Sequence, residues 1–185
     1  LKSREDLFEI FLINIPWGRT GMTIDDTDER RWIDQTILKT IAHTQAGHQY
    51  DMSFQVTIPL EFEKIAPINI AYTAGIETTK VAPEWIAKSN EVVDKIITIS
   101  NHSKNVFEYT KYNVTNNETG EQTENWGLQV PVEVINYPVR EYDEEPIDIE
   151  FTTKNNFLTI SQWGPRKNME NTIHWFLEEF KDDED

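Results

Sequence analysis

Short apolar segments alternate with helical segments along most of the 185-residue chain, and this alternation limits the fold more than any other feature. Apolar runs of strand length lie at residues 7–16, 52–59, 68–75 and 94–100. Strands that alternate with helices are typical of α/β domains, in which helices flank a mainly parallel sheet. We therefore expect an α/β, Rossmann-like fold with a mainly parallel sheet and flanking helices.

Three helices are predicted in the first two thirds of the chain. Residues 25–47 repeat isoleucine and leucine at helical spacing, and Gly47 is suited to end the helix. A second helix begins at Pro83, because proline fits the first helical turn. A third covers residues 101–111, directly after Ser100, whose hydroxyl group is suited to cap it.

The composition changes after residue 111. Residues 112–127 are polar and rich in turn formers, which predicts a surface loop, and residues 130–138 are typical of an extended strand. Residues 140–155 are acidic and interrupted by proline, as in a linker. A last strand is predicted at 157–160, before a Gly-Pro turn and an amphipathic helix.

These segments indicate a chain of more than one part. We expect an N-terminal domain over residues 1–128, a crossover or linker over 129–155, and the start of a second domain over 156–185. The chain opens without the first strand and loop of such a fold and ends directly after a helix, so the expected fold is incomplete. Unpaired sheet edges in an incomplete domain favour a homodimer.

The net charge of −16 limits the partners. Residues 1–110 hold 11 Lys and Arg against 16 Asp and Glu, which gives −5, and residues 111–185 hold 6 against 17, which gives −11. A field of this sign repels nucleic acid and anionic membranes, so neither is expected as a partner. Any cation that binds phosphate in the second half must act at a local, shaped site.

Other features of the sequence favour a cytoplasmic protein. No apolar stretch approaches the roughly 18–20 residues that a transmembrane helix needs. The first residues lack the apolar core of a signal peptide. The chain has no cysteine, which excludes disulfides and thiolate metal sites.

Several familiar sites are absent from the sequence. No glycine-rich dinucleotide loop and no P-loop occurs. His43 and His48 lie five residues apart, which fits no standard zinc site. Ser100 and Ser103 lack the surroundings of a catalytic serine. We expect no metal and no cofactor.

Arg166 and Lys167 stand just before the last helix, in the sequence GPRK. The N-terminus of a helix presents unpaired N–H groups at the positive end of its dipole, and this suits a phosphate group. A lysine adds a point charge there, and an arginine adds a fork of donors. Two solvated turn residues are the alternative interpretation.

Polar residues that follow predicted strands are candidates for a cleft, because ligands bind at the carboxyl ends of parallel strands. Glu77 follows the strand at 68–75, Asn14 lies at the end of the first apolar run, and His102 follows the strand at 94–100. For Glu77 and His102, a role near a helix start is the alternative interpretation.

Four segments, in this order, carry a resemblance to a known family. They are AYTAGIETTKVAPEWI (71–86), SNEVVDKIITISNHSKNVF (89–107), VEVINYPV (132–139) and FLTISQWGPRKNMENTIHWF (157–176). Together they resemble the middle of a retaining GT-B glycosyltransferase of family four. The resemblance covers roughly residues 70–176, and the first 70 residues fit only in outline.

The resemblance implies two Rossmann-like domains with a cleft between them, and no obligatory metal. In such enzymes an arginine and, five residues on, a lysine before a glycine face the donor diphosphate. Lys167 falls on the lysine position, whereas Gln162 stands at the arginine position and Asn168 at the glycine position. Gln162 brings no charge, so Arg166 is the residue that would compensate. Glu77, Asn14 and His102 would lie on the acceptor side.

The leading hypothesis is therefore a hexosyltransferase-like enzyme. It would move a sugar from a nucleotide-diphosphate sugar to a hydroxyl group of a glycan or lipid-linked acceptor, with retention of configuration. A stretch that lacks most of the donor domain is expected to be inactive by itself. The alternative is a non-catalytic α/β module that binds a nucleotide or a protein, and Gln162 is the residue that favours it.

Overall fold

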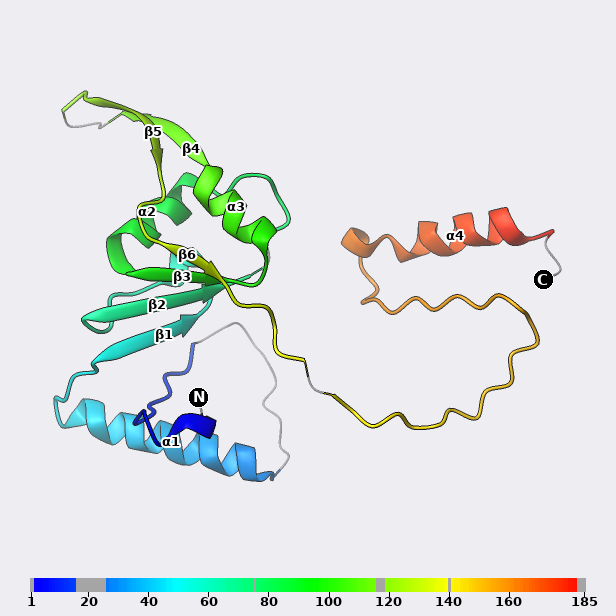
Figure 1. The fold of residues 1–185 in the computed structure, drawn as a ribbon, viewed down its shortest axis with the longest axis horizontal. Helices are drawn as coiled ribbons and strands as arrows, with labels where there is room; N and C mark the ends of the chain where they lie inside the picture. The colour runs from blue at the N-terminus through cyan, green and yellow to red at the C-terminus, as the bar shows by residue number, and fades with distance from the viewer. Residues whose placement is uncertain (1, 16–25, 75, 116–118, 140, 183–185) are drawn as a thin grey trace. The chain divides into compact units, whose positions relative to one another are not determined.

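The computed structural model describes residues 2–15, 26–74, 76–115, 119–139 and 141–182. The chain divides into two compact units, Leu1–Pro138 and Val139–Asp185 (Figure 1). Each unit is described by itself below.

A four-stranded parallel sheet forms the centre of the first unit (Figure 1). Its strands are β1 (Met52–Val56), β2 (Ile68–Thr73), β3 (Lys95–Thr98) and β6 (Val132–Val134). They lie in the order β1-β2-β3-β6, and every neighbouring pair is parallel. The prediction of an α/β fold with a parallel sheet and flanking helices is confirmed at this level.

Two helices and the sheet enclose the main hydrophobic core. The helices are α2 (Pro83–Val92), which begins with its proline as predicted, and α3 (Asn101–Tyr109). The Ser100 hydroxyl oxygen caps α3 by accepting a hydrogen bond from the Ser103 N–H at 3.1 Å. The core contains Ile86 of α2, Phe107 of α3 and Ile96 of β3, and each of these side chains is fully buried.

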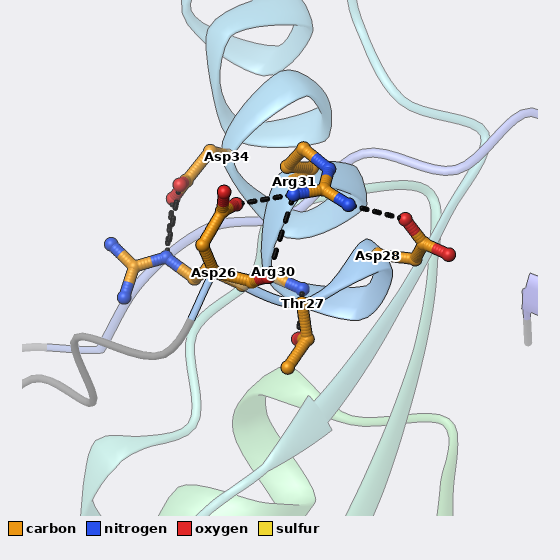
Figure 2. A network of polar contacts seen from close by, with 6 residues as sticks. All are labelled: Asp26, Thr27, Asp28, Arg30, Arg31 and Asp34. Atoms are coloured by element: carbon orange, nitrogen blue, oxygen red, sulfur yellow. Dashed lines mark hydrogen bonds and ion pairs between the residues drawn. The ribbon is translucent and has the colours of Figure 1, made fainter.

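Helix α1 (Asp28–Gln45) also forms where the sequence predicts a helix. The Thr27 side chain caps it by accepting a hydrogen bond from the Arg30 N–H. Two arginines of the first turn pair with nearby carboxylates, in the exposed network of Asp26, Asp28, Arg30, Arg31 and Asp34 (Figure 2). The chain leaves the helix at Gly47, whose φ of 74° suits glycine.

The strand predicted over residues 7–16 is wrong for residues 7–15, and residue 16 lies outside the described residues. After a short 3₁₀ turn, η1 (Lys2–Arg4), this segment runs without joining the sheet. The Leu12 N–H donates to Thr40 Oγ1 of α1 at 2.8 Å, and the Phe11 ring lies 4.2 Å from the ring of His43. The segment therefore packs on α1 instead of pairing with a strand.

The surface loop predicted over residues 112–127 is wrong for residues 112–115 and 122–127, and residues 116–118 lie outside the described residues. The chain forms an antiparallel pair there, β4 (Lys111–Thr115) and β5 (Gln122–Gly127), and residues 119–121 belong to neither strand. Tyr112 and Trp126 lie opposite each other in the pair, and both pack against the hydrophobic core. These two aromatic residues anchor the pair to the core. Because the strands are otherwise polar except for Val114, their composition suggests a loop.

The strand predicted over residues 130–138 is present but shorter. It is β6, which pairs with β3 in the sheet of the first unit. The Ile135 N–H continues this pairing by donating to the Thr98 carbonyl oxygen at 2.9 Å. The first unit extends to Pro138 for this reason.

The second unit contains a short 3₁₀ turn, η3 (Pro165–Lys167), and helix α4 (Met169–Phe180). The strand predicted at 157–160 is wrong, because these residues are extended but pair with no other strand. The Phe157 ring packs instead against the rings of Phe176 and Phe180, at 5.1 and 5.7 Å. Within the described residues of the chain, no helix is long and apolar enough to span a bilayer.

Candidate functional site

The carboxyl edge of the parallel sheet gathers several of the predicted site residues. Strands β2, β3 and β6 all run in the same direction, so the segments that follow them emerge at one edge. This is the edge at which α/β sheets bind ligands. Glu77 lies in the segment after β2, and His102 lies in the first turn of α3, after β3.

A hydrogen bond brings these two segments together. The Nε2 atom of His102 lies 3.2 Å from the carbonyl oxygen of Thr78, the neighbour of Glu77. A carbonyl oxygen only accepts, so this contact requires the proton on Nε2 and leaves Nδ1 as the acceptor of a neutral ring. The edge thus combines an imidazole acceptor with an exposed carboxylate from the adjacent segment.

The segment after β6 is fastened to the same edge. The Asn136 side-chain amide donates to the Ile99 carbonyl oxygen at 2.8 Å. The Tyr72 hydroxyl group, from the end of β2, donates to the Ile135 carbonyl oxygen at 3.4 Å. Backbone from three strand ends is therefore held together by side chains of the sheet and its loops.

Tyr72 is also part of a row of aromatic rings. Its ring lies 6.2 Å from that of Phe54 and 6.3 Å from that of Tyr137. Burial, with a smaller contribution from the neighbouring Tyr137, raises the pKa of the Tyr72 phenol. The hydroxyl group stays protonated at neutral pH and remains a donor.

Asn14 lies elsewhere in the first unit. It lines a groove of about 790 Å³ whose walls include residues 7–15 and strand β1. The predicted acceptor-side set is therefore divided. Glu77 and His102 come from connected segments at the sheet edge, whereas Asn14 belongs to the groove beside β1.

The cations of the GPRK sequence belong to the second unit. Arg166 and Lys167 lie in η3 with exposed side chains, and Gln162 is exposed just before it. The Lys167 N–H donates to the Gly164 carbonyl oxygen at 3.0 Å. Among the residues that the structure describes, Lys167 makes no side-chain ion pair.

Asn168 connects this turn to α4. It adopts a left-handed conformation with φ of 52°, and its side chain does not cap the first N–H groups of the helix. These N–H groups point along the helix axis toward its N-terminus, as in any α-helix. An exposed lysine thus stands beside a helix start that lacks a side-chain cap.

No group of three or more histidine, aspartate or glutamate residues that would hold a metal ion occurs among the described residues. Comparisons of the chain with protein families, with curated proteins and with solved structures give no match. The resemblance to GT-B glycosyltransferases therefore stays a prediction.

The groove beside β1 contains residues that the sequence reasoning missed. His43, Tyr50 and Phe11 form a cluster of rings at one end, with centroids 4.2 to 5.3 Å apart. The spacing of His43 and His48 excludes a standard zinc site and suits a helix end beside a glycine turn, but their contacts with aromatic residues have no signature in the sequence. The absence of charge in MSFQV, the sequence of β1, is a signal that could have been read as an open sheet edge.

Proposed function

We propose that the chain is part of a glycosyltransferase of the retaining GT-B type, in which the first unit supplies residues for the acceptor and the second unit supplies residues for the donor. The observation that carries the proposal is the carboxyl edge of the parallel sheet. There the Thr78–His102 hydrogen bond joins the segment after β2 to the start of α3. The order of the four sequence segments described above supports the same function.

On the acceptor side, His102 and Glu77 have the chemistry that a sugar hydroxyl group requires. The Nδ1 atom of a neutral His102 accepts a hydrogen bond from such a hydroxyl group, and a carboxylate accepts a second one. These contacts orient the acceptor oxygen for attack on the donor sugar.

On the donor side, Lys167 is the residue proposed to hold the diphosphate of a nucleotide sugar. Its positive charge stabilises the negative charge that develops on the departing diphosphate. Arg166 and Gln162 are proposed as further donors of hydrogen bonds to the phosphate oxygens.

The test is calorimetric titration of the chain with UDP and GDP. Lys167→Ala removes one charge-assisted contact and is expected to weaken binding of the preferred nucleotide about tenfold. Lys181→Ala is the matched control, because Lys181 is also exposed but lies at the other end of α4. Equal affinities of the two variants, or no binding of either nucleotide, would refute the diphosphate site.

The alternative function is a non-catalytic α/β module that binds a nucleotide. Gln162 favours it, because glutamine supplies no charge at the position where the resembling enzymes carry an arginine. Nucleotide binding that depends on Lys167 but is not strengthened by a sugar on the diphosphate, in titrations with UDP and GDP sugars, would support this module.

A further inference from the structure

Strand β1 is an open edge of the sheet. It pairs with β2 on one side, and no strand of the described residues pairs with it on the other. The Thr57 N–H donates to the Tyr72 carbonyl oxygen at 3.2 Å, which sets the register of the ladder. Because alternate residues of a parallel strand bond to the same neighbour, Met52, Phe54 and Val56 direct their backbone N–H and C=O groups outward.

This edge lacks the usual protection against a further strand. Natural edges are often blocked by proline, by lysine or by a bulge. The sequence of β1, MSFQV, contains no proline and no charged residue, and its register with β2 has no irregularity. Along this edge runs a row of backbone groups that no strand of the described residues pairs with.

Residues 7–15 line the groove together with β1 but do not pair with it as a strand. The Leu12 N–H is bound to Thr40 Oγ1 of α1, and the Phe11 ring contacts the rings of His43 and Tyr50. These contacts fix the segment on α1, and a groove of about 790 Å³ remains beside β1. This volume lies within the range of roughly 300–1,000 Å³ that is common for ligand pockets.

The charged side chains that line the groove in the described part of the chain are acidic. They are the four carboxylates of Glu9, Asp51, Glu61 and Glu63, and no lysine or arginine of the described residues lines it. Glu9 lies 3.7 Å from Lys39 Nζ, and the Glu61 carboxylate accepts a hydrogen bond from Thr57. Asp51 and Glu63 make no ion pair with any of the described residues, so their charges are available to a ligand.

We propose that the groove binds an extended, cationic peptide segment of a partner protein, which adds a strand to the edge of β1. The backbone of the peptide pairs with the outward groups of Met52, Phe54 and Val56. Alternate side chains of a strand point to opposite faces, so apolar residues of the peptide lie over the exposed Phe54 ring. Its lysine or arginine residues meet Asp51 and Glu63.

The negative charge of the groove favours a cationic peptide over other ligands. A second copy of the chain, which the sequence predicts as a partner for unpaired sheet edges, carries a net charge of −16. At this acidic groove it is repelled at long range, as are nucleic acid and acidic peptides, so the charge disfavours a homodimer through β1. An extended peptide with lysine or arginine at every second position has the complementary charge and can form the backbone ladder. The inference does not depend on the proposed glycosyltransferase function.

Three fluorescein-labelled peptides test the proposal on the full chain by fluorescence anisotropy. One alternates lysine with valine, the second alternates glutamate with valine, and the third is the lysine–valine peptide with every backbone nitrogen methylated. Only the first has both the charge and the backbone donors, so it is expected to bind at least about tenfold more tightly than the other two. Equal binding of the methylated peptide would refute strand addition, and absence of lysine–valine binding would refute the whole proposal.

Variants of β1 test the backbone ladder directly. Phe54→Pro removes an outward N–H and leaves the bonds to β2 in place, whereas Phe54→Ala removes the ring and keeps the N–H. The proline variant is expected to lose peptide binding about tenfold relative to the alanine variant. Where the proline variant does not fold, hydrogen exchange of the wild-type chain replaces it. Slower exchange at Met52, Phe54 and Val56 with peptide supports the proposal, and unchanged exchange overturns it.

A double variant, compared with a matched control, tests the role of the carboxylates in the groove. The double variant Asp51→Asn, Glu63→Gln is expected to weaken binding of the lysine–valine peptide about tenfold and to reduce its dependence on salt. The control, Glu84→Gln with Glu91→Gln, changes the net charge equally on α2, outside the groove. Equal weakening by both double variants would mean that only the overall charge attracts the peptide, and this would overturn the assignment to the groove.

Discussion

Asn69 of β2 is the polar side chain whose loss should cost the first unit most. It is almost completely buried. Its Oδ1 atom accepts hydrogen bonds from Ser53 Oγ, the Ile65 N–H and the Ala66 N–H, at 2.8 to 3.1 Å, and its Nδ2 donates to the Ala66 carbonyl oxygen at 2.7 Å. Asn69→Ala removes these four bonds. At about 1 kcal/mol for each bond, the expected loss is about 4 kcal/mol. This is a large part of the roughly 5–15 kcal/mol that stabilises a typical domain.

The assay is urea denaturation followed by far-UV circular dichroism, in which the shift of the midpoint gives the change in the free energy of unfolding. Asn90→Ala is the comparison, because the Asn90 side chain makes only two such bonds, with the Gly127 carbonyl oxygen and the Gln129 N–H. Its expected cost is about 2 kcal/mol. A cost of Asn69→Ala no larger than that of Asn90→Ala would refute the reasoning.

The pH dependence of the stability of Asn69→Asp gives a second test of the same hydrogen bonds. A protonated aspartate can replace the amide, since its hydroxyl group donates to the Ala66 carbonyl oxygen. An ionised one would lie near Asp94, whose Oδ2 already accepts the Asn69 N–H at 2.8 Å. Burial, this charge and the Ala66 carbonyl oxygen raise the pKa of the new carboxyl group in the folded state, whereas the three hydrogen bonds donated to Oδ1 lower it. A net rise makes the stability of the variant, relative to wild type, fall as pH rises above the ordinary carboxyl pKa, and a net fall makes it rise, so the pH dependence measures which effect dominates.

Three further predictions concern packing and charge. Phe107→Ala empties a fully buried site in the core and should lower the free energy of unfolding by about 3–5 kcal/mol in urea denaturation. Gly127→Ala places a methyl group 2.9 Å from a backbone carbonyl oxygen and should cost about 1–3 kcal/mol, whereas Gly164→Ala, with nothing within 4 Å, should cost almost nothing. Lys95 donates a hydrogen bond to Glu133 at 2.8 Å and lowers the pKa of that carboxyl group. The stabilisation from this pair is complete above the ordinary carboxyl pKa and is lost as pH falls through the lowered pKa of Glu133. Lys95→Gln should therefore raise the Glu133 pKa, as measured by an NMR titration.

The periodic pattern of apolar residues was sufficient to predict the elements whose partners lie nearby in the sequence. Helix α1, with its end at Gly47, and helix α2, with its start at Pro83, follow from spacing and capping alone. The runs at 7–16 and 157–160 have strand-like composition, yet pairing depends on distant segments. In the structure, the described residues of both runs pack on a helix instead, through Phe11 and Phe157.

The same limit applies to the candidate site. The sequence places Glu77 and His102 after adjacent strands, and order along the chain is sufficient to predict that they share an edge. The bond between His102 and Thr78 requires the conformation of a loop, which no pattern encodes. The groove that Asn14 lines depends on where the run at 7–15 lies, so no sequence argument could predict it.

The sheet shows an unexpected distribution of polarity on β1 and β2. Their buried side chains include Ser53, Gln55 and Asn69, whereas Met52 and Phe54 are exposed. The partners of the buried polar groups account for this pattern. Gln55 and Asn69 bond to backbone groups of the segment that follows β1, and Ser53 bonds to both of these side chains. The irregular backbone of this segment cannot satisfy its own hydrogen bonds as a helix does.

Gln55 illustrates the consequence for the groove. Its amide donates to the Glu63 carbonyl oxygen at 2.7 Å and accepts from the Glu63 N–H at 2.8 Å, so the sheet holds this segment by both of its backbone groups. Asn69 does the same for Ile65 and Ala66. The residues of this segment include Glu61 and Glu63, which line the groove beside β1. The polar residues buried in the sheet therefore fix the position of the carboxylates that would attract a cationic peptide.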